Sequence, residues 1–137
     1  MVGVIYLRTQ SYSVPVADGV LRLQEGSSLN EGRLEIRYKN LFGGVCDDNF
    51  GASEAATACH QLGFAGAERV VPCCHGQRRH GEIWLDDVDC NSGEVWLYNC
   101  THGGWGVEDC HFMEEVGVKC NGIPHDIICV QHVMDCE

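Results

Sequence analysis

The stretch SEAATACHQLGF, residues 53–64, has the pattern of one amphipathic helix together with both of its ends. Ser53 is a good N-cap, and the acidic Glu54 favours the positive end of the helix dipole. Gly63 can adopt the left-handed conformation at which many helices end. Three residues stand at i, i+4 and i+7 and so share one face, namely Ala55, Cys59 and Leu62. Cys59 is therefore expected to point inward, where a structural disulfide would lie.

Strands are predicted on both sides of this helix. Before it, residues 20–23 and 33–38 alternate apolar and polar side chains, which is the period of half-buried strands. The intervening stretch 25–32 has turn composition and predicts a hairpin. The stretch 91–109 is mostly loop. Three shorter stretches are also strand candidates, namely 43–46 before the helix and 83–85 and 116–120 after it. The expected fold class is α+β, a small loop-rich domain with one main helix.

The composition describes a compact acidic domain. The chain has 137 residues, and 45% of them are hydrophobic, which is enough for a small core. Nine Lys and Arg against twenty Asp and Glu give a net charge of −11, which argues against nucleic acid as a physiological partner. No apolar stretch is long enough to cross a bilayer, so no direct membrane insertion by this segment is expected.

Cysteine is the unusual component, with 10 residues spread along the chain and no Cys-x-x-Cys pair. An even number of such cysteines predicts disulfides and an oxidising compartment. We therefore expect an extracellular domain, from a secreted protein or the ectodomain of a membrane protein. The apolar run near the N-terminus is too short for a signal peptide, which favours a piece of a longer chain.

Several motifs occur in a fixed order between residues 20 and 121. They are LRL at 21–23, EGRLEI at 31–36, GVCDD at 44–48, ACHQLGF at 58–64, IWLDDVDC at 83–90, HGGWG at 102–106 and GVKC at 117–120. In this order they resemble the scavenger receptor cysteine-rich (SRCR) domain family. The resemblance implies a curved antiparallel β-sheet that cradles one helix, without a catalytic centre. It places the SRCR domain at 19–121, a lead-in at 1–18 and a tail at 122–137.

The resemblance also implies the disulfide pairing of the family's six-cysteine subgroup. That subgroup would join Cys46 to Cys110, Cys59 to Cys120 and Cys90 to Cys100. Asn30 and Phe64 stand where the eight-cysteine subgroup has its additional pair. The sequence alone leaves the pairing open, because ten cysteines allow on the order of 945 connectivities.

Four cysteines lie outside the family pattern: Cys73, Cys74, Cys129 and Cys136. Adjacent cysteines rarely pair with each other, so the preferred interpretation ties Cys73 and Cys74 to the two cysteines of the tail. In one alternative, the last two belong to a truncated neighbouring domain. In another, Cys73, Cys74 and His75 form a zinc site with a tail ligand, although their spacing is poor for it.

Two carboxylate sites for a cation are implied by the resemblance. The first site consists of Asp47, Asp48 and Glu114, and the second consists of Asp86 and Asp109. At the position of Asp109 the family more often has Asn. The expected ion is Ca²⁺, which prefers several hard oxygen ligands, with Mg²⁺ as the alternative. Asp47 and Asp48 would point to opposite faces of one strand, so they can share an ion only in a turn, which residues 49–51 allow. The opposing interpretation is a solvated acidic face.

A cationic cluster is the candidate ligand-binding site, at Arg69, Arg78 and Arg79, beside His75 and His80. The resemblance implies a non-enzymatic recognition module of the scavenger-receptor type that binds polyanionic or protein ligands through cations and arginines. Such ligands include microbial surfaces, and binding them would give the domain a role in innate immunity. The opposing interpretation of the cluster is an ordinary variable loop.

Two other functions remain open at this stage. In the main alternative, the domain is an accessory part of a larger secreted or membrane-anchored enzyme, such as a serine protease or a lysyl-oxidase-like protein. An enzyme in its own right is poorly supported, because the sequence has no Gly-x-Ser-x-Gly, His-Glu-x-x-His or Gly-rich phosphate loop.

Asn99-Cys100-Thr101 fits the acceptor pattern for N-linked glycosylation. Its middle residue is an expected disulfide cysteine, so modification is expected to be inefficient.

Overall fold

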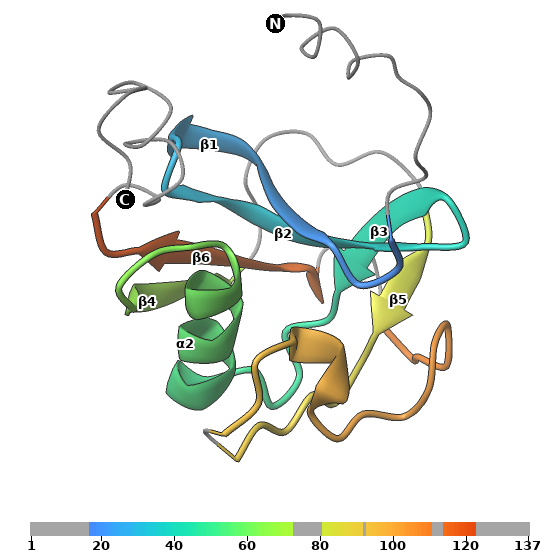
Figure 1. The fold of residues 1–137 in the computed structure, drawn as a ribbon. Helices are drawn as coiled ribbons and strands as arrows, with labels where there is room; N and C mark the ends of the chain where they lie inside the picture. Colours follow the sequence, from blue (N-terminus) through green and yellow to red (C-terminus); the bar gives the residue numbers. More distant parts are fainter. Residues whose placement is uncertain (1–16, 73–80, 92, 111–113, 123–137) are drawn as a thin grey trace, which may run out of the picture.

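The computed structural model describes residues 17–72, 81–91, 93–110 and 114–122. These residues form a six-stranded sheet, one α-helix and one short 3-10 helix (Figure 1). In chain order the elements are β1 (Leu21–Ser28), β2 (Glu31–Tyr38), β3 (Leu41–Val45), α2 (Ala52–Gln61), β4 (Ala67–Pro72), β5 (Ile83–Leu85), η1 (Leu97–Asn99) and β6 (Val116–Cys120). This is the expected α+β class.

The sheet is mixed, because one of its strand pairs is parallel. Its order is β4-β6-β2-β3-β5, and β1 pairs with β2 outside this path. All pairs are antiparallel except β3 with β5. The expected antiparallel pairing is therefore confirmed except at this edge, where β3 and β5 are parallel. The chain between β3 and β5 passes through α2 and β4, and such a crossover lets the two strands run in the same direction.

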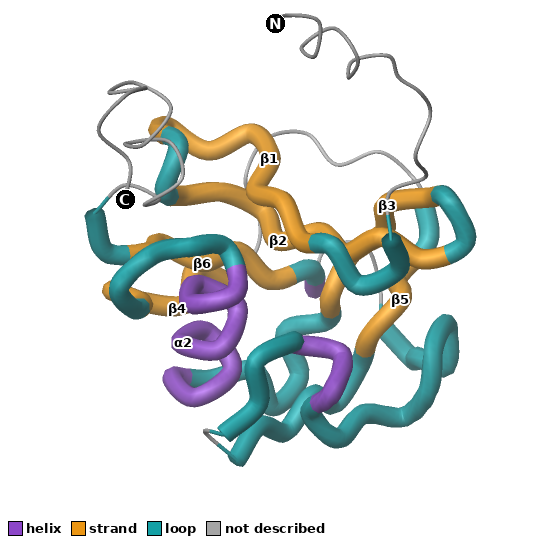
Figure 2. The backbone as a smooth tube through the Cα atoms, in the orientation of Figure 1, coloured by secondary structure: helices purple, strands orange, loops and turns teal. Residues whose placement is uncertain are grey.

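The hydrophobic core lies between the sheet and α2, which packs against β4 and β6 (Figures 1 and 2). Leu34 and Ile36 of β2 and Leu85 of β5 are among its largest fully buried side chains. The helix contributes the small buried residues Ala55 and Ala58, which allow a close approach to the sheet. Loops surround the rest of this small core, and no helix among the described residues is long and apolar enough to cross a membrane.

β2 is buried on both faces, although its alternating sequence predicts a half-buried strand. The polar residues Arg33 and Glu35 are only 8% and 6% exposed. The Arg33 guanidinium donates to Glu35 Oε2 at 3.1 Å and to Glu25 Oε1 at 2.7 Å, while Arg22 pairs with Glu35 at 2.8 Å. Because buried charges are tolerated when they are paired, this network accounts for burial of the polar face.

The helix has the expected C-terminal end and a different N-terminal end. Gly63 has φ +98°, the left-handed conformation predicted for the stop. The N-cap is Gly51, so the prediction of Ser53 is wrong. Instead, Glu54 Oε1 accepts the Gly51 N–H at 2.8 Å, which stabilises an earlier start. Cys59 is fully buried, as its helical position predicts.

β4 was not expected from the sequence, and it changes the position of Arg69. This residue lies in an edge strand that pairs with β6, so its assignment to a loop is wrong. Its guanidinium lies 3.7 Å from Glu31 Oε2. The strand is specified by its pairing partner more than by its own weak alternation, which explains why the local pattern did not reveal it.

Three disulfides join the described residues: Cys46–Cys110, Cys59–Cys120 and Cys90–Cys100. They are the pairs that the family resemblance implies. At the positions of the eight-cysteine subgroup's additional pair, Phe64 is buried and Asn30 Nδ2 donates to the Cys120 carbonyl at 2.7 Å. The remaining cysteines and His75 lie outside the described residues, and so do Arg78 and Arg79.

Removing a long-loop bridge should destabilise the domain more than removing the short one. The residues of Cys59–Cys120 are separated by 61 positions and those of Cys90–Cys100 by 10. Chain entropy alone gives losses of about 4 and about 3 kcal/mol for the two double Cys→Ala variants. Denaturant unfolding measures both free energies, and an equal or reversed ranking would contradict the prediction.

Candidate cation site

The first acidic residues of the site follow the C-terminal ends of two parallel strands, β3 and β5. Asp47 and Asp48 come just after β3, and Asp86 comes directly after β5. In the parallel pair, Val45 is opposite Leu85, and the Cys46 N–H donates to the Leu85 carbonyl at 2.9 Å. The carboxyl ends of β3 and β5 therefore lie side by side (Figure 1), and the acidic residues follow directly in the chain.

A third segment closes the site from the chain just before β6. The Cys46–Cys110 disulfide ties this segment to the end of β3. The Asp47 N–H also donates to the Glu114 carbonyl at 2.7 Å, and Cys46 and Glu115 form an isolated bridge. These contacts bring the side chains of Asp109 and Glu114 to the two loops.

The carboxylates form two overlapping clusters that share Asp48. Oxygen atoms of Asp48, Asp86 and Asp109 all lie within 4.8 Å of one another. Asp48 also lies within 4.8 Å of the Glu114 carboxylate. The sequence suggested two separate sites. The structure instead brings together four of the five predicted acids, and Asp48 is common to both clusters. Asp47 belongs to neither cluster, although it is close enough to feel the charges of Asp48 and Glu114.

A turn after the acidic pair makes this arrangement possible. Asn49 has φ +62°, and the Phe50 N–H donates to the Asp47 carbonyl at 3.2 Å. Asn tolerates the left-handed conformation better than most residues, because its side chain can form local hydrogen bonds. Here Asn49 Nδ2 donates to Asp87 Oδ1 at 3.0 Å, which links the two acidic loops. The chain therefore turns at residues 47–50, slightly earlier than residues 49–51, where the sequence allows a turn.

Burial, together with the crowding of negative charge, raises the pKa values of three carboxyl groups. Burial contributes most for Asp47, followed by the charges of Asp48 and Glu114. For Asp48, desolvation again comes first, and Glu114 and Asp109 add repulsion. For Asp86, burial is the main cause of the raised pKa, and the side chain of the neighbouring Asp109 raises it further. Raised values mean that the folded chain disfavours the charged forms unless a cation compensates them.

Asp86 is the most buried acid of the site, with only 2% of its surface exposed. Its Oδ2 atom accepts the Asp109 N–H at 3.1 Å. The buried Oδ1 atom accepts no hydrogen bond from the described residues. A buried anionic oxygen without a donor is costly in a protein interior. Together with two more carboxylates, it fits a hard divalent cation, which would supply the missing positive charge.

Arg69 lies away from these acids. It is on β4, at the sheet edge opposite β5, where Asp86 begins its loop. Arg22 and Arg37 form another cationic group, which the sequence analysis did not identify. Their guanidinium carbons lie 3.9 and 5.6 Å from the centre of the Phe42 ring. The cross-strand pairing of Arg37 with Phe42 in the β2–β3 hairpin is the feature that brings them together.

The fold and its three disulfides define a small disulfide-bonded α+β module. The chain belongs to the scavenger receptor cysteine-rich domain family, whose family model matches residues 24–121. An SRCR domain is itself non-catalytic, and the matched segment is this module. The crystal structure of the third SRCR domain of murine neurotrypsin is similar, with 32% identity and a TM-score of 0.67, over 76% of this chain and 97% of that one.

Other relatives extend the comparison. The SRCR domain of mouse MARCO, in its dimeric form, is 36% identical with a TM-score of 0.61, over 67% of this chain and 87% of that one. Lysyl oxidase homolog 4 of Bos taurus is 43% identical over 82% of this chain, and lysyl oxidase homolog 2A of Danio rerio is 48% identical over 66% of it. The chain spans only 15% and 12% of the lengths of these two relatives.

Asp48→Asn should stabilise the metal-free protein at neutral pH. The folded state raises the pKa of this carboxyl, so stability falls as the pH rises from the ordinary carboxyl range of about 4 through the raised value. The variant removes this repulsion and should have a higher Tm than wild type in chelator, with the difference vanishing near pH 3. Thermal unfolding across this pH range measures the effect.

Glu82→Gln is the matched control, because it removes one exposed negative charge outside the clusters. The same rise in Tm for both variants would mean that only net charge matters. A lower Tm for Asp48→Asn would contradict the proposed repulsion.

Proposed function

We propose that this chain is a non-enzymatic, extracellular recognition module of the scavenger-receptor type that binds Ca²⁺ and, through it, anionic ligands. The observation that carries the proposal is the convergence of Asp48, Asp86 and Asp109, with a buried Asp86 oxygen that accepts no hydrogen bond from the described residues. A divalent ion would neutralise this group and keep free coordination positions for a ligand oxygen. Mg²⁺ is the alternative ion.

Two ions can use the cluster if they share Asp48. One would contact Asp48 and Glu114, and the other would contact Asp48, Asp86 and Asp109. Asp47, which lies outside both clusters, is proposed as a further ligand of the first ion. Asp109 adds a negative charge where the family more often has Asn. This extra charge favours cation binding at the second position and strengthens repulsion when no ion is bound.

The ligand class that we propose is a polyanion or an acidic protein surface, including microbial surfaces. Bound cations would contact its sulfate, phosphate or carboxylate groups, and arginines would add bidentate hydrogen bonds. Arg69, with Arg78 and Arg79, is the candidate arginine set. Because Arg69 lies at the sheet edge opposite β5, a ligand that used both regions would have to be extended.

Calcium binding should be saturable and should depend on Asp48. Calorimetric titration of the oxidised chain is expected to give a Kd on the order of 10⁻⁴–10⁻³ M, typical of extracellular modules. Asp47→Asn/Asp48→Asn should abolish binding at both positions. Asp86→Asn/Asp109→Asn should remove only the second ion, and Glu82→Gln should bind like wild type. Wild-type affinity in the first variant, or no binding by wild type, would contradict the proposal.

Polyanion binding should require both calcium and the arginine set. A sulfated polysaccharide immobilised on a sensor surface should retain the wild-type chain in calcium and release it in chelator. Arg69→Ala/Arg78→Ala/Arg79→Ala should weaken binding by roughly tenfold or more. Lys119→Ala, which removes a cation that pairs with Glu68, serves as the control. Binding that persists in chelator would contradict the cation-dependent mechanism.

A second function is supported by the lysyl oxidase homologs, which match this chain over a small part of their own length. In this alternative the domain is an accessory part of a larger secreted or membrane-anchored enzyme, and its ligand binding would place that enzyme on a target. The size of the natural polypeptide that reacts with an antibody against this domain decides between the two.

A further inference from the structure

The chain contains one triplet of the Asn-x-Ser/Thr type, Asn99-Cys100-Thr101. None of its other asparagines is followed by Ser or Thr at the second position. A triplet of this type can accept an N-linked oligosaccharide in the secretory pathway when its Asn is accessible. The triplet plays no part in the cation site, so its accessibility is a separate question.

Asn99 and Thr101 are both exposed, while Cys100 between them is 2% exposed. Asn99 is the last residue of η1, and its N–H donates to the Trp96 carbonyl at 2.9 Å. Among the described residues, its side-chain amide has no hydrogen-bond partner. A substituent on Nδ2 would therefore extend into solvent without disrupting an internal contact.

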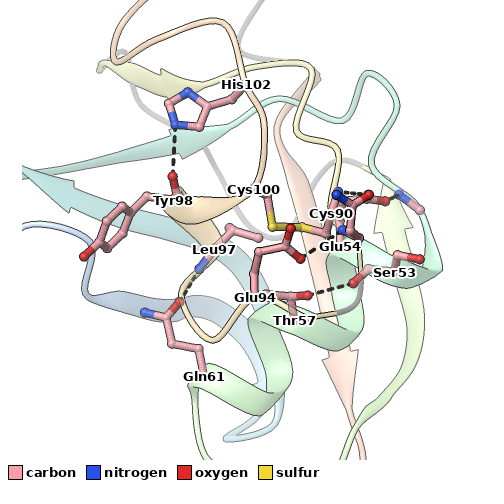
Figure 3. Close-up of a disulfide and its surroundings, with 12 residues drawn as sticks. Ser53, Glu54, Thr57, Gln61, Cys90, Glu94, Leu97, Tyr98, Cys100 and His102 are labelled. Carbon is pink, nitrogen blue, oxygen red and sulfur yellow. Dashed lines mark hydrogen bonds between the residues drawn. A yellow bond between two sulfur atoms is a disulfide. The ribbon is translucent and has the colours of Figure 1, made fainter.

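The turn that presents Asn99 is firmly attached to the domain. Leu97 is fully buried, and its N–H donates to Gln61 Oε1 on α2 at 2.7 Å (Figure 3). On the other side, the Cys90–Cys100 disulfide holds the chain next to Glu54, whose Oε2 accepts the Cys90 N–H (Figure 3). The acceptor side chain is thus displayed at the surface by a buried scaffold.

An exposed apolar surface lies next to this position in the chain. Val95 is 68% exposed and Trp96 is 43% exposed, so two neighbouring apolar side chains face water here. The Trp96 ring lies 6.1 Å from the Tyr98 ring, so the two form a partly exposed aromatic pair. The apolar face of a sugar ring can cover such a pair and remove apolar surface from water.

We propose that Asn99 carries an N-linked glycan whose first sugars cover Trp96 and Tyr98. In the transfer, a bond forms between Nδ2 of Asn99 and the anomeric carbon of a lipid-pyrophosphate-linked oligosaccharide. The bond from that carbon to the phosphate oxygen breaks, and the lipid pyrophosphate leaves with its electron pair. Nδ2 loses one proton, so no oxidant or reductant is needed. The modification uses the extracellular location proposed above but does not depend on calcium.

Disulfide formation competes with this transfer. The two cysteines of the Cys90–Cys100 bridge are only 10 positions apart, so their loop closes quickly in the newly made chain. Once the bridge has formed, Cys100 is buried and the triplet can no longer adopt an extended conformation in the transferase. Occupancy at Asn99 is therefore partial in the wild-type chain and set by which reaction occurs first.

The test is expression of the full chain behind a secretion signal in eukaryotic cells. Mass spectrometry before and after amidase release of N-glycans should show a fraction of the wild-type chain with one glycan and with Asn99 converted to Asp on release. Asn99→Gln and Thr101→Ala should remove the glycan, and the matched control Thr101→Ser should retain it. Wild-type chain without any glycan would overturn the proposal, as would a glycan that persists in Asn99→Gln.

A second variant tests the competition. Cys90→Ser/Cys100→Ser keeps an acceptor triplet and removes the bridge, so occupancy should approach completion. Glycan content is measured in cells and medium together, which keeps the result valid even if this variant folds poorly. Unchanged or lower occupancy would overturn the competition. Failure of glycosylation would leave the calcium titration unaffected, so this inference and the proposed function can fail separately.

Discussion

The Cys46–Cys110 disulfide is the constraint on which the candidate site depends. It joins the end of β3 to the segment before β6, and these regions carry the acids that would otherwise repel one another. The hydrogen bond from the Asp47 N–H to the Glu114 carbonyl adds a second tie. Coulomb repulsion between carboxylates separated by less than 5 Å favours an open site, so a covalent frame is needed to keep it assembled without a cation.

Through this frame, binding of the proposed cation would change the stability of the fold. The burial and mutual repulsion that raise the pKa values of Asp47, Asp48 and Asp86 oppose folding of the metal-free chain. A bound divalent ion reverses the sign of the contribution from the same residues, because it favours their charged forms. The buried ion pairs of β2 follow a different logic, since Arg33 compensates Glu35 within the protein itself.

Local patterns predicted a large part of the fold and failed where distant segments decide the outcome. The helix with buried Cys59 and the β1–β2 hairpin follow from periodicity and turn composition, which act over a few residues. The predicted turn at 25–32 is too long, because β1 extends to Ser28 and β2 begins at Glu31. The strand β4 and the parallel β3–β5 pair depend on partners that are far away in the chain. The start of α2 also differs, because Glu54 stabilises Gly51 as the N-cap in place of Ser53.

At the site, residue types alone indicate the chemistry: carboxylates suited to hard cations, and cysteines whose family pattern implied the three bridges that the structure contains. The folded arrangement, in contrast, places Asp48 in both acid clusters, buries Asp86 and puts Arg69 at the opposite edge of the sheet. The reason is physical. Side-chain chemistry belongs to each residue, whereas distances between residues follow from the strand order and from the crossover that aligns the ends of β3 and β5.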